Sequence, residues 1–507
     1  MLEMLAAGFL SVLTIKNMLF LIGGVCVGIV LGAIPGLSAT MAIALVIPLT
    51  MTLDPTTSLI MLLGAYNGGI FGGSIAAILL ATPGTSAAAA TVADGFQMAK
   101  KGQGIKAIKT ALVASVHGCI FSCIVLILVA GPVAKFALEF GPGEYSVLML
   151  FALTMIGSLV GKNFGKGLLG GILGVLVSLV GIDSMTALPR LTFDIPTLTK
   201  GIDLIGMLIG LLAVSEIFVQ IEKIAKGQVS AHLPPPQHPD DSRFLPSEYK
   251  RILPTIGRSS LIGCFIGCLP ALGTTLAAFL GYDMAKRASK HPEKFGTGIV
   301  EGVAGPEAAN NAVCGANLIP LLAFGVPGDV VAAILMGAFL VQGLTPGPFI
   351  FREAPHVVYG VYAGLIISNL CLFVIAWFSA KQFARVASLK TNIIYPIILA
   401  FCIVGTYAIN QHIGDIWVML CFAILGYVMI KFGFSPATMI IGFILGPIFE
   451  RYMRQALLVS GGSVDIFFSS PICIVLWIIT AFSVYTIIRN SRRDGKKSQQ
   501  AEASEAS

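Results

Sequence analysis

The residues with the clearest chemistry are carboxyl and amide side chains inside an apolar stretch. In "GVAGPEAANNAVCGANLIP", residues 302–320, Glu307, Asn310 and Asn311 stand at positions i, i+3 and i+4, so a helix would place them on one face. A carboxylate with amide carbonyls suits Na⁺, and a carboxylate by itself can carry a proton. The alternative is a glutamate that caps a helix start at the membrane surface, one residue after Pro306.

Hydroxyl side chains gather at four breaks in otherwise apolar segments. These breaks are "GAIPGLSAT" (residues 32–40), "ATPGTSA" (81–87), "GCLPALGTT" (267–275) and "GVPGD" (325–329). Proline ends a helix, and the next helix begins with free N–H groups and the positive end of its dipole. Such an end binds an anion without an arginine, and neighbouring hydroxyls can donate to carboxylate oxygens.

We therefore predict an anion site at the breaks and a cation site beside it. Small residues also pack membrane helices together, which is the alternative for any single glycine or hydroxyl. Asp329 is predicted to be either a helix cap or an ion ligand, and Tyr66 and Asn67 are expected to face the cavity. The predicted substrate-binding residues are Pro35, Gly36, Ser38, Thr40, Tyr66, Asn67, Thr82, Pro83, Gly84, Thr85, Pro270, Gly273, Thr274, Thr275, Pro327 and Gly328, and the predicted cation-coupling residues are Glu307, Asn310, Asn311 and Asp329.

The elements that must position these residues are membrane helices. Of the 507 residues, 56% are hydrophobic and 11% are charged, and the mean hydropathy is +0.90. This composition predicts an all-α polytopic membrane protein with about 11–14 membrane segments. The net charge of +7 lies mostly in short loops and the tail, so it concerns membrane orientation and excludes nucleic acid as the expected partner. Windows without Asp, Glu, Lys or Arg cover residues 17–53, 55–93, 110–134, 259–282, 330–351, 432–449 and 466–488.

The breaks occur in two sets. The motif around Pro35 recurs 235 residues later around Pro270, and the motif around Pro83 recurs 244 residues later around Pro327. Two matches in the same order indicate an internal duplication. The loop "TMTLDPTTS" after the first break has no Lys or Arg, whereas its counterpart "DMAKRASKHPEK" has four. Since cytoplasmic loops are enriched in these residues, the two repeats are predicted to be inverted in the membrane.

The predicted organisation follows from this duplication. Residues 1–225 form the first membrane repeat, 226–256 a cytoplasmic linker, 257–488 the second membrane repeat, and 489–507 a cytoplasmic tail. Residues 17–52 and 257–284 are expected to be re-entrant hairpins from opposite sides, with the proline breaks at their tips; residue 54 is then external and residue 290 cytoplasmic. Inverted repeats with broken helices are typical of secondary transporters.

Several function classes are disfavoured by missing motifs. The ten cysteines include no C-x-x-C pair, and the six histidines include no H-x-x-x-H pair, so no metal site or cofactor is predicted. A catalytic set such as H-E-x-x-H or G-x-S-x-G and a P-loop are also absent from the sequence, so neither an enzyme nor a primary pump is predicted. A channel or a structural membrane scaffold remains the alternative, because duplicated halves also build pores.

The sequence resembles the TctA family, the large membrane subunit of tripartite tricarboxylate transporters, over about residues 15–490. The motifs that carry this resemblance are "GAIPGLSAT", "GAYNGGIFGGSIAAILLATPGTSAA", "DGFQMAKKGQG" and "GPEAANNAVCGANLIPLLAFGVPGD". The resemblance implies a multi-pass symporter of the bacterial inner membrane that imports a di- or tricarboxylate, such as citrate, with Na⁺ or H⁺. It also implies a periplasmic solute-binding protein (TctC-like) and a small membrane subunit (TctB-like) as partners.

The family's motifs fall on particular residues of this chain, with three departures. Tyr66, Asn67 and Gly68 stand where the family often has Tyr-Tyr-Gly, residues 81–86 where it often has Asn-Thr-Pro-Gly-Glu-Ser, and Asp329 where a small or hydroxyl residue is usual. These changes lie beside the predicted site, so citrate is not assumed to be the substrate. The matching positions are residues 35–37, 82–84, 306–312 and 327–328.

Overall fold

The computed structural model describes residues 1–157, 164–183, 185–226, 242–270, 272–386, 391–486 and 489. Almost all regular structure in these residues is helical, and the expected all-α polytopic class is confirmed. The exception is one short antiparallel pair, β1 (Gly181–Ile182) with β2 (Pro189–Arg190). Six described helices are long and apolar enough to cross a membrane, and shorter apolar helices accompany them.

The helices follow one another in two series, before and after residues 227–241, which lie outside the described residues. The first series is α1 (Leu2–Val12), α2 (Ile15–Ala33), α3 (Ala39–Thr50), α4 (Pro55–Leu80), α5 (Ala89–Lys100), α6 (Gly104–Ala137), α7 (Pro142–Met155), α8 (Phe164–Ser178), α9 (Pro196–Thr199), α10 (Leu204–Leu208) and α11 (Ser215–Ala225). The second is α12 (Pro246–Gly267), α13 (Gly273–Arg287), α14 (Val300–Ala316), α15 (Leu318–Phe324), α16 (Val330–Val341), α17 (Ile350–Glu353), α18 (Pro355–Val386), α19 (Thr391–Asn410), α20 (Ile413–Lys431) and α21 (Pro436–Val459).

Helices α2 and α3 form a hairpin whose tip lies at the first predicted break. Gly36 has a φ of 84°, a left-handed conformation that favours glycine, and the Ser38 hydroxyl accepts from Met41 N at 3.3 Å to cap α3. At the other end, Lys16 Nζ lies 2.6 Å from Asp54 Oδ1, and the Ser58 hydroxyl donates to Thr50 O at 2.8 Å. The open ends of both hairpin helices, α2 and α3, therefore contact the start of α4.

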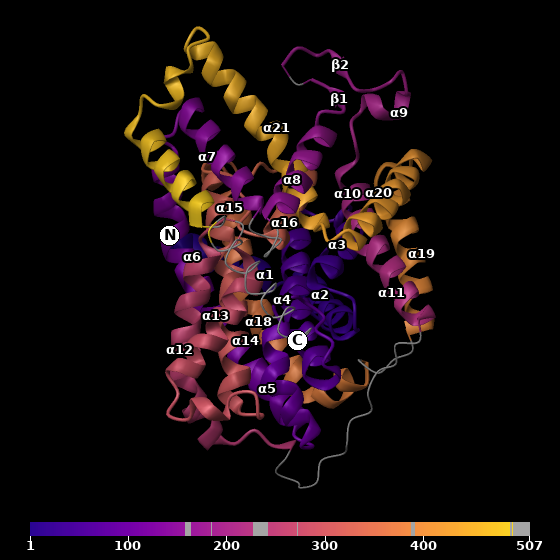
Figure 1. The fold of residues 1–507 in the computed structure, drawn as a ribbon, viewed down its shortest axis with the longest axis vertical. Coiled ribbons are helices and arrows are strands. Elements are labelled where there is room, and N and C mark those ends of the chain that lie inside the picture. Colours follow the sequence, from indigo (N-terminus) through magenta and orange to yellow (C-terminus); the bar gives the residue numbers. More distant parts are fainter. Residues whose placement is uncertain are drawn as a thin grey trace, which may run out of the picture.

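Helices α12 and α13 form the second hairpin. Its tip follows Gly267, and Gly273, with a φ of 69°, begins α13. Near the open end, Arg251 of α12 pairs with Glu301, at the start of α14. Figure 1 shows α12, α13 and α5 reaching one end of the molecule, and α21 and the β1–β2 segment reaching the opposite end. The two expected hairpins are thus present, with their tips at the predicted prolines.

Glycines line the contact between α2 and α4 and bring the two backbones close together. A Cβ on Gly28 would lie 2.4 Å from Ala65 O and 2.8 Å from Gly69 N, and a Cβ on Gly68 would lie 2.3 Å from Val25 O. Small residues allow helix backbones in a membrane to approach this closely. The packing interpretation of these glycines is therefore correct.

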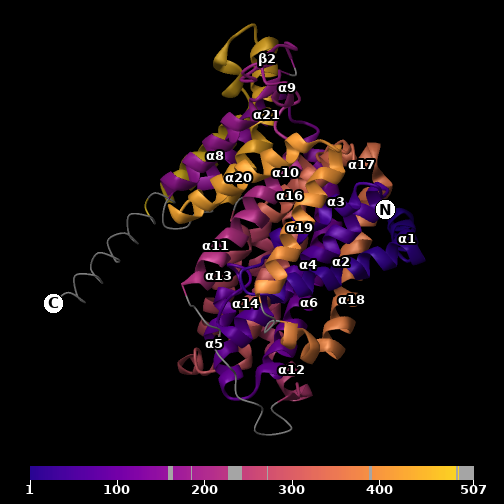
Figure 2. The same ribbon diagram turned by 90° about the vertical axis from the view of Figure 1, so that its right-hand side faces the viewer.

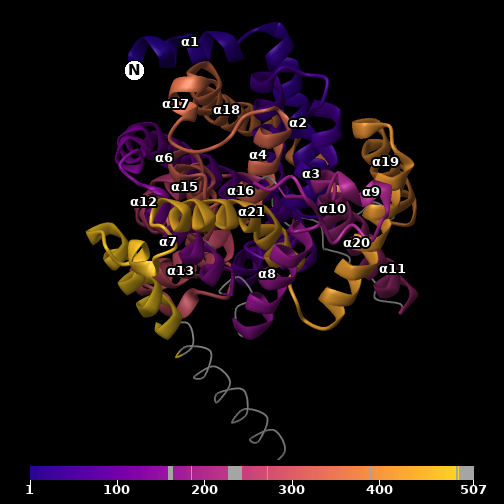
Figure 3. The ribbon, with the colours of Figure 1, turned by 90° about the horizontal axis from the view of Figure 1, so that it is seen from above.

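In the core, helices of one series pack against helices of the other. Helix α6 packs mainly against α14 and α18 of the second series, and α18 also packs against α4 of the first. Further out, α21 packs against α8 and α7, and α20 packs against the continuous helix from Leu204 to Ala225. The views in Figures 2 and 3 show these helices side by side, with α1 along one edge beside α18. The two series form one interleaved body.

One predicted boundary is displaced. Helix α12 begins at Pro246, within the linker predicted at residues 226–256, because the polar start of this helix finds partners. The Glu248 carboxylate accepts from Leu245 N at 2.8 Å as a cap, and it also pairs with Lys106 Nζ at 3.1 Å. The remaining linker residues 227–241 and the tail residues 490–507 lie outside the described residues.

A glycine substitution tests the close contact between α2 and α4. Gly28→Ala should lower the free energy of unfolding by about 1–3 kcal/mol, because the new methyl group would collide with the backbone of α4. Gly23→Ala in the same helix is the matched control, since a Cβ there meets nothing within 4 Å. Thermal unfolding of the detergent-solubilised protein measures both. Equal midpoints for the two variants would contradict this packing.

Candidate functional site

The first two predicted breaks lie together against one face of α4. A Cβ on Gly69 would lie 2.7 Å from Ala39 Cα, and a Cβ on Gly73 would lie 2.9 Å from Thr85 Cγ2. The Gly84 N–H donates to Gly73 O at 3.3 Å. Because Gly69 and Gly73 have no side chains, two non-helical segments that are far apart along the chain can pack against α4.

At the first break the Ser38 hydroxyl caps α3, and at the second break the Thr85 hydroxyl forms a turn just before α5. Ser38 Oγ lies 2.6 Å from Thr40 Oγ1 and accepts from Met41 N, and Thr85 Oγ1 accepts from Ala88 N at 3.2 Å. Thr82 and Pro83 are exposed, whereas Gly84 is buried. The helix ends at these breaks are therefore satisfied in part by the protein, and the second break remains open to solvent.

The tip of the first hairpin contacts two residues that sequence reasoning missed. The Tyr395 hydroxyl of α19 donates to Pro35 O at 3.1 Å. The Gln220 side chain of α11 lies against Gly36, where a Cβ would come within 2.1 Å of its Nε2. Nothing in the spacing pointed to these residues, because both come from helices distant in sequence from the break.

The breaks of the second series lie in different environments. Gly273 is buried and left-handed at the start of α13, and Pro270, Thr274 and Thr275 are partly exposed. Pro327 and Gly328 are buried, with a Cβ on Gly328 placed 2.9 Å from Asn317 Cβ. A contact joins a break of one series to a break of the other, because Ser86 Oγ lies 2.6 Å from Thr275 Oγ1.

Asp329 is a helix cap within a buried polar network. Its carboxylate accepts from Ala332 N at 2.8 Å, at the start of α16, and from Asn317 Nδ2 at 2.9 Å. The same amide nitrogen donates to Tyr66 OH at 3.1 Å. The cap interpretation of Asp329 is therefore confirmed, and the network connects the last break to α4.

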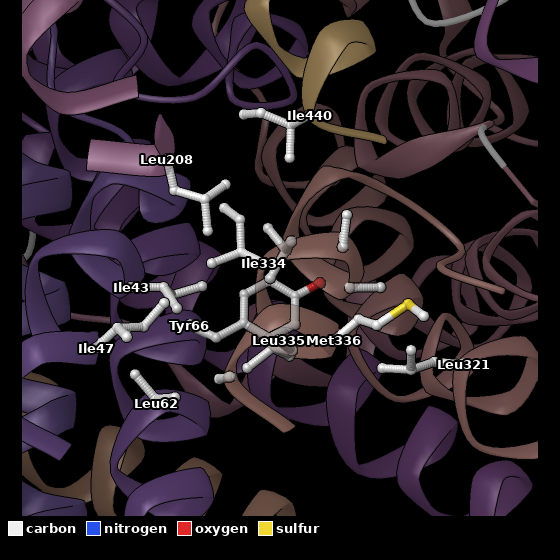
Figure 4. Packing of buried hydrophobic residues seen from close by; sticks show 14 of the residues in the cluster. Ile43, Ile47, Leu62, Tyr66, Leu208, Leu321, Ile334, Leu335, Met336 and Ile440 are labelled. Atoms are coloured by element: carbon white, nitrogen blue, oxygen red, sulfur yellow. The ribbon is translucent and has the colours of Figure 1, made fainter. Parts of the chain in front are cut away.

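Tyr66 and Asn67 contribute to helix packing, although they were expected to face the cavity. Both side chains are fully buried. Asn67 Nδ2 donates to Ser368 Oγ of α18 at 2.7 Å, and Figure 4 shows the Tyr66 ring among apolar side chains that include Ile334 and Leu335. In this conformation neither residue is open to solvent, because the glycine-rich face of α4 draws neighbouring helices close.

Glu307 lies in the protein core and not at a membrane surface. Helix α14 begins at Val300, and Glu307, with 0% exposure, stands two turns inside it, so the helix-start interpretation is wrong. Its carboxylate accepts from Ser74 Oγ at 2.7 Å, from Ser115 Oγ at 3.2 Å, and from the Thr91 hydroxyl. These three hydroxyls come from α4, α6 and α5 of the first series.

The two asparagines of this cluster differ from each other. Asn311 Nδ2 donates to Ser115 Oγ at 2.9 Å and to Glu307 O at 3.0 Å. Asn310 is 1% exposed, and neither polar atom of its side chain has a hydrogen-bond partner among the described residues. The spacing thus found Glu307 and its asparagines, but it missed Ser74, Thr91 and Ser115. The only available signal was the presence of Ser and Thr in apolar segments, which is common in membrane helices.

Substitutions at Asp329 test the network around the last break. Asp329→Ala should destabilise the protein by about 1–2 kcal/mol, because α16 loses its cap and Asn317 loses an acceptor. Asp329→Asn keeps an oxygen that can cap the helix, so its loss should be smaller. Thermal unfolding midpoints of the two purified variants compare them. Equal losses would show that the negative charge, and not the cap, stabilises this segment.

The chain matches a protein-family model and is similar to two bacterial proteins. The model of the Tripartite tricarboxylate transporter TctA family matches residues 18–441. An uncharacterised 52.8 kDa protein from the TAR-I ttuC' 3' region of Agrobacterium vitis is 36% identical over 468 residues, which is 92% of each chain.

A second protein of Agrobacterium vitis is similar to part of the chain. An uncharacterised protein from the TAR-II ttuC' 3' region of the same organism is 39% identical over 210 residues, which cover 41% of this chain and 87% of that protein. No solved structure matches the chain. The family match and the first relative both extend over most of the sequence. The chain therefore belongs to the TctA family of tripartite tricarboxylate transporters.

Proposed function

We propose that the chain is the large membrane subunit of a secondary transporter that imports a di- or tricarboxylate across the bacterial inner membrane by symport with Na⁺ or H⁺. A TctC-like periplasmic protein would deliver the substrate, and a TctB-like membrane subunit would complete the assembly. The single observation that carries this proposal is the meeting of broken helices from both series, joined where Ser86 contacts Thr275, in a chain of a transporter family.

The proposed anion site lies at this meeting point. Helix ends after Pro83 and after Pro270 supply N–H groups and positive dipole ends, and the exposed or partly exposed Thr82, Thr274 and Thr275 supply hydroxyl donors. The break at Pro327 is buried instead. This difference supports a site that opens on one side of the membrane at a time, as alternating access requires.

Inverted repeats are part of the proposal. The hydrogen bond from Asn67 to Ser368 and the one from Asn311 to Ser115 join equivalent helices in opposite directions between the series. The asparagines are 244 residues apart, the same spacing that separates Pro83 from Pro327. Such paired contacts are expected if one fold was duplicated and the copies exchange a helix.

The proposed cation site centres on Glu307, with Asn310 and Asn311. A buried carboxylate in a membrane protein is costly unless a cation or proton balances it, and no described Lys, Arg or His pairs with Glu307. Asp329 is less suited to bind a cation because its oxygen already caps α16 and accepts from Asn317. An uncoupled channel or a scaffold would not need an ionisable carboxyl group in its core.

Uptake into proteoliposomes tests the proposal. The full complex should accumulate a labelled carboxylate only with its binding protein and a Na⁺ or proton gradient. Pro83→Ala and Pro327→Ala should each slow uptake at least about tenfold, or ~1.4 kcal/mol, because the helix can then continue through the break. Pro132→Ala is the control, since Pro132 is exposed inside α6 and away from the breaks. Normal uptake by both break variants would rule out a broken-helix site.

Cysteine labelling tests the inverted orientation. Asp54 pairs with Lys16, so the exposed neighbour Thr52 is the better labelling position beside it. In a variant in which Cys421, the exposed cysteine of the described residues, is replaced by Ser, Thr52→Cys should react with an impermeant maleimide from outside. Lys290→Cys should react only after the membrane is opened. Labelling of both positions from one side would contradict the inversion.

A further inference from the structure

We propose that Glu307 and three hydroxyls of the first series, those of Ser74, Thr91 and Ser115, together bind one Na⁺ ion. This inference rests on the proposed function, which leaves the coupling ion open, and adds the ligands and their mechanical role. The four side chains come from α14, α4, α5 and α6. They meet around one buried carboxylate.

The charge of this cluster fits a monovalent cation. Glu307 has no exposed surface, and its hydrogen-bond partners among the described residues are all neutral hydroxyls. Hydroxyl donors stabilise a carboxylate but do not neutralise it, so the ionised form of Glu307 needs one positive charge beside it. A single bound Na⁺ supplies this charge, whereas a divalent ion would leave an excess positive charge.

The oxygen atoms of the cluster fit Na⁺ better than a proton. The contacts to Ser74 at 2.7 Å and to Ser115 at 3.2 Å place hydroxyl oxygens beside the two carboxylate oxygens. The Ser74 and Thr91 oxygens accept no hydrogen bond within the described part of the chain, so their lone pairs are free to bind a cation. Asn310, three residues from Glu307 on the same helix, adds an amide oxygen that has no partner there. A proton needs one acceptor, and this arrangement offers several.

Thr91 gives the cluster a connection to the anion site. It belongs to α5, the helix that follows the Pro83 break. One turn further along α5, Asp94 accepts from Gly298 N at 2.7 Å and from Ile299 N at 3.1 Å, just before α14. A cation shared by Thr91 and Glu307 would fix the break end of α5 to α14 as well. Bound Na⁺ would thereby order the proposed anion site, and the anion would in turn strengthen Na⁺ binding by the same factor.

Na⁺ binding to the purified full-length protein tests this site without transport. Replacing choline chloride by NaCl at constant ionic strength should raise the thermal unfolding midpoint of the wild-type protein in a saturable way. Thr91→Val should weaken the Na⁺ half-saturation at least about tenfold, because one ligand is lost at nearly constant volume. Thr110→Val is the matched control, since that buried hydroxyl donates only to Lys106 O of its own helix at 2.9 Å. Glu307→Gln should abolish the Na⁺ response while remaining folded.

The outcomes separate this site from the proposed function. Unchanged Na⁺ affinity in Thr91→Val, or a wild-type midpoint that responds to pH but not to Na⁺, would overturn the Na⁺ site even if carboxylate uptake is normal. A Na⁺ response that Thr91→Val weakens and Thr110→Val does not would support the site, even if reconstituted uptake fails and the transporter proposal with it. Citrate as the probe anion should also bind more tightly with Na⁺ in the wild type than in Thr91→Val.

Discussion

Backbone that leaves a helix inside hydrocarbon has no water to bond with, and the rest of this structure depends on how that constraint is met. At three of the four breaks, backbone groups find partners within the protein. Gly84 N donates to Gly73 O, Pro35 O accepts from Tyr395, and Asp329 caps α16. The glycine face of α4 makes this possible, because only a helix without side chains there admits non-helical segments so closely.

This arrangement explains why the two series of helices interleave. A break that must be covered by protein needs helices on several sides, and each series by itself supplies too few. Helix α6 covers α14, and α18 covers α4, with Asn311 and Asn67 making the corresponding hydrogen bonds to Ser115 and Ser368. These contacts give the proposed coupling a continuous packed route between helices of the two series.

The two series share break motifs at a similar spacing, but they differ in their buried acidic side chains. At the spacing of 244 residues, Leu63 corresponds to Glu307, and Thr85 corresponds to Asp329. The buried Glu307 carboxyl group thus has no counterpart at this spacing in the first series. Both series contain proline breaks, and only the second has acidic residues at these two positions. In the proposed transporter, the second series would hold the cation and both series would contribute to the anion site.

The sequence by itself determined the membrane class, the hairpin tips at Pro35 and Pro270, and the shared helix face of Glu307 and its asparagines, because composition, proline chemistry and helical spacing are local properties. It could not determine that Tyr66 and Asn67 lie in packed helix contacts, or that Ser74, Thr91 and Ser115 surround Glu307. Only the tertiary structure decided these points. Contacts between residues about 190 to 300 positions apart depend on which helices pack together, and single hydroxyls in apolar segments carry no spacing signal.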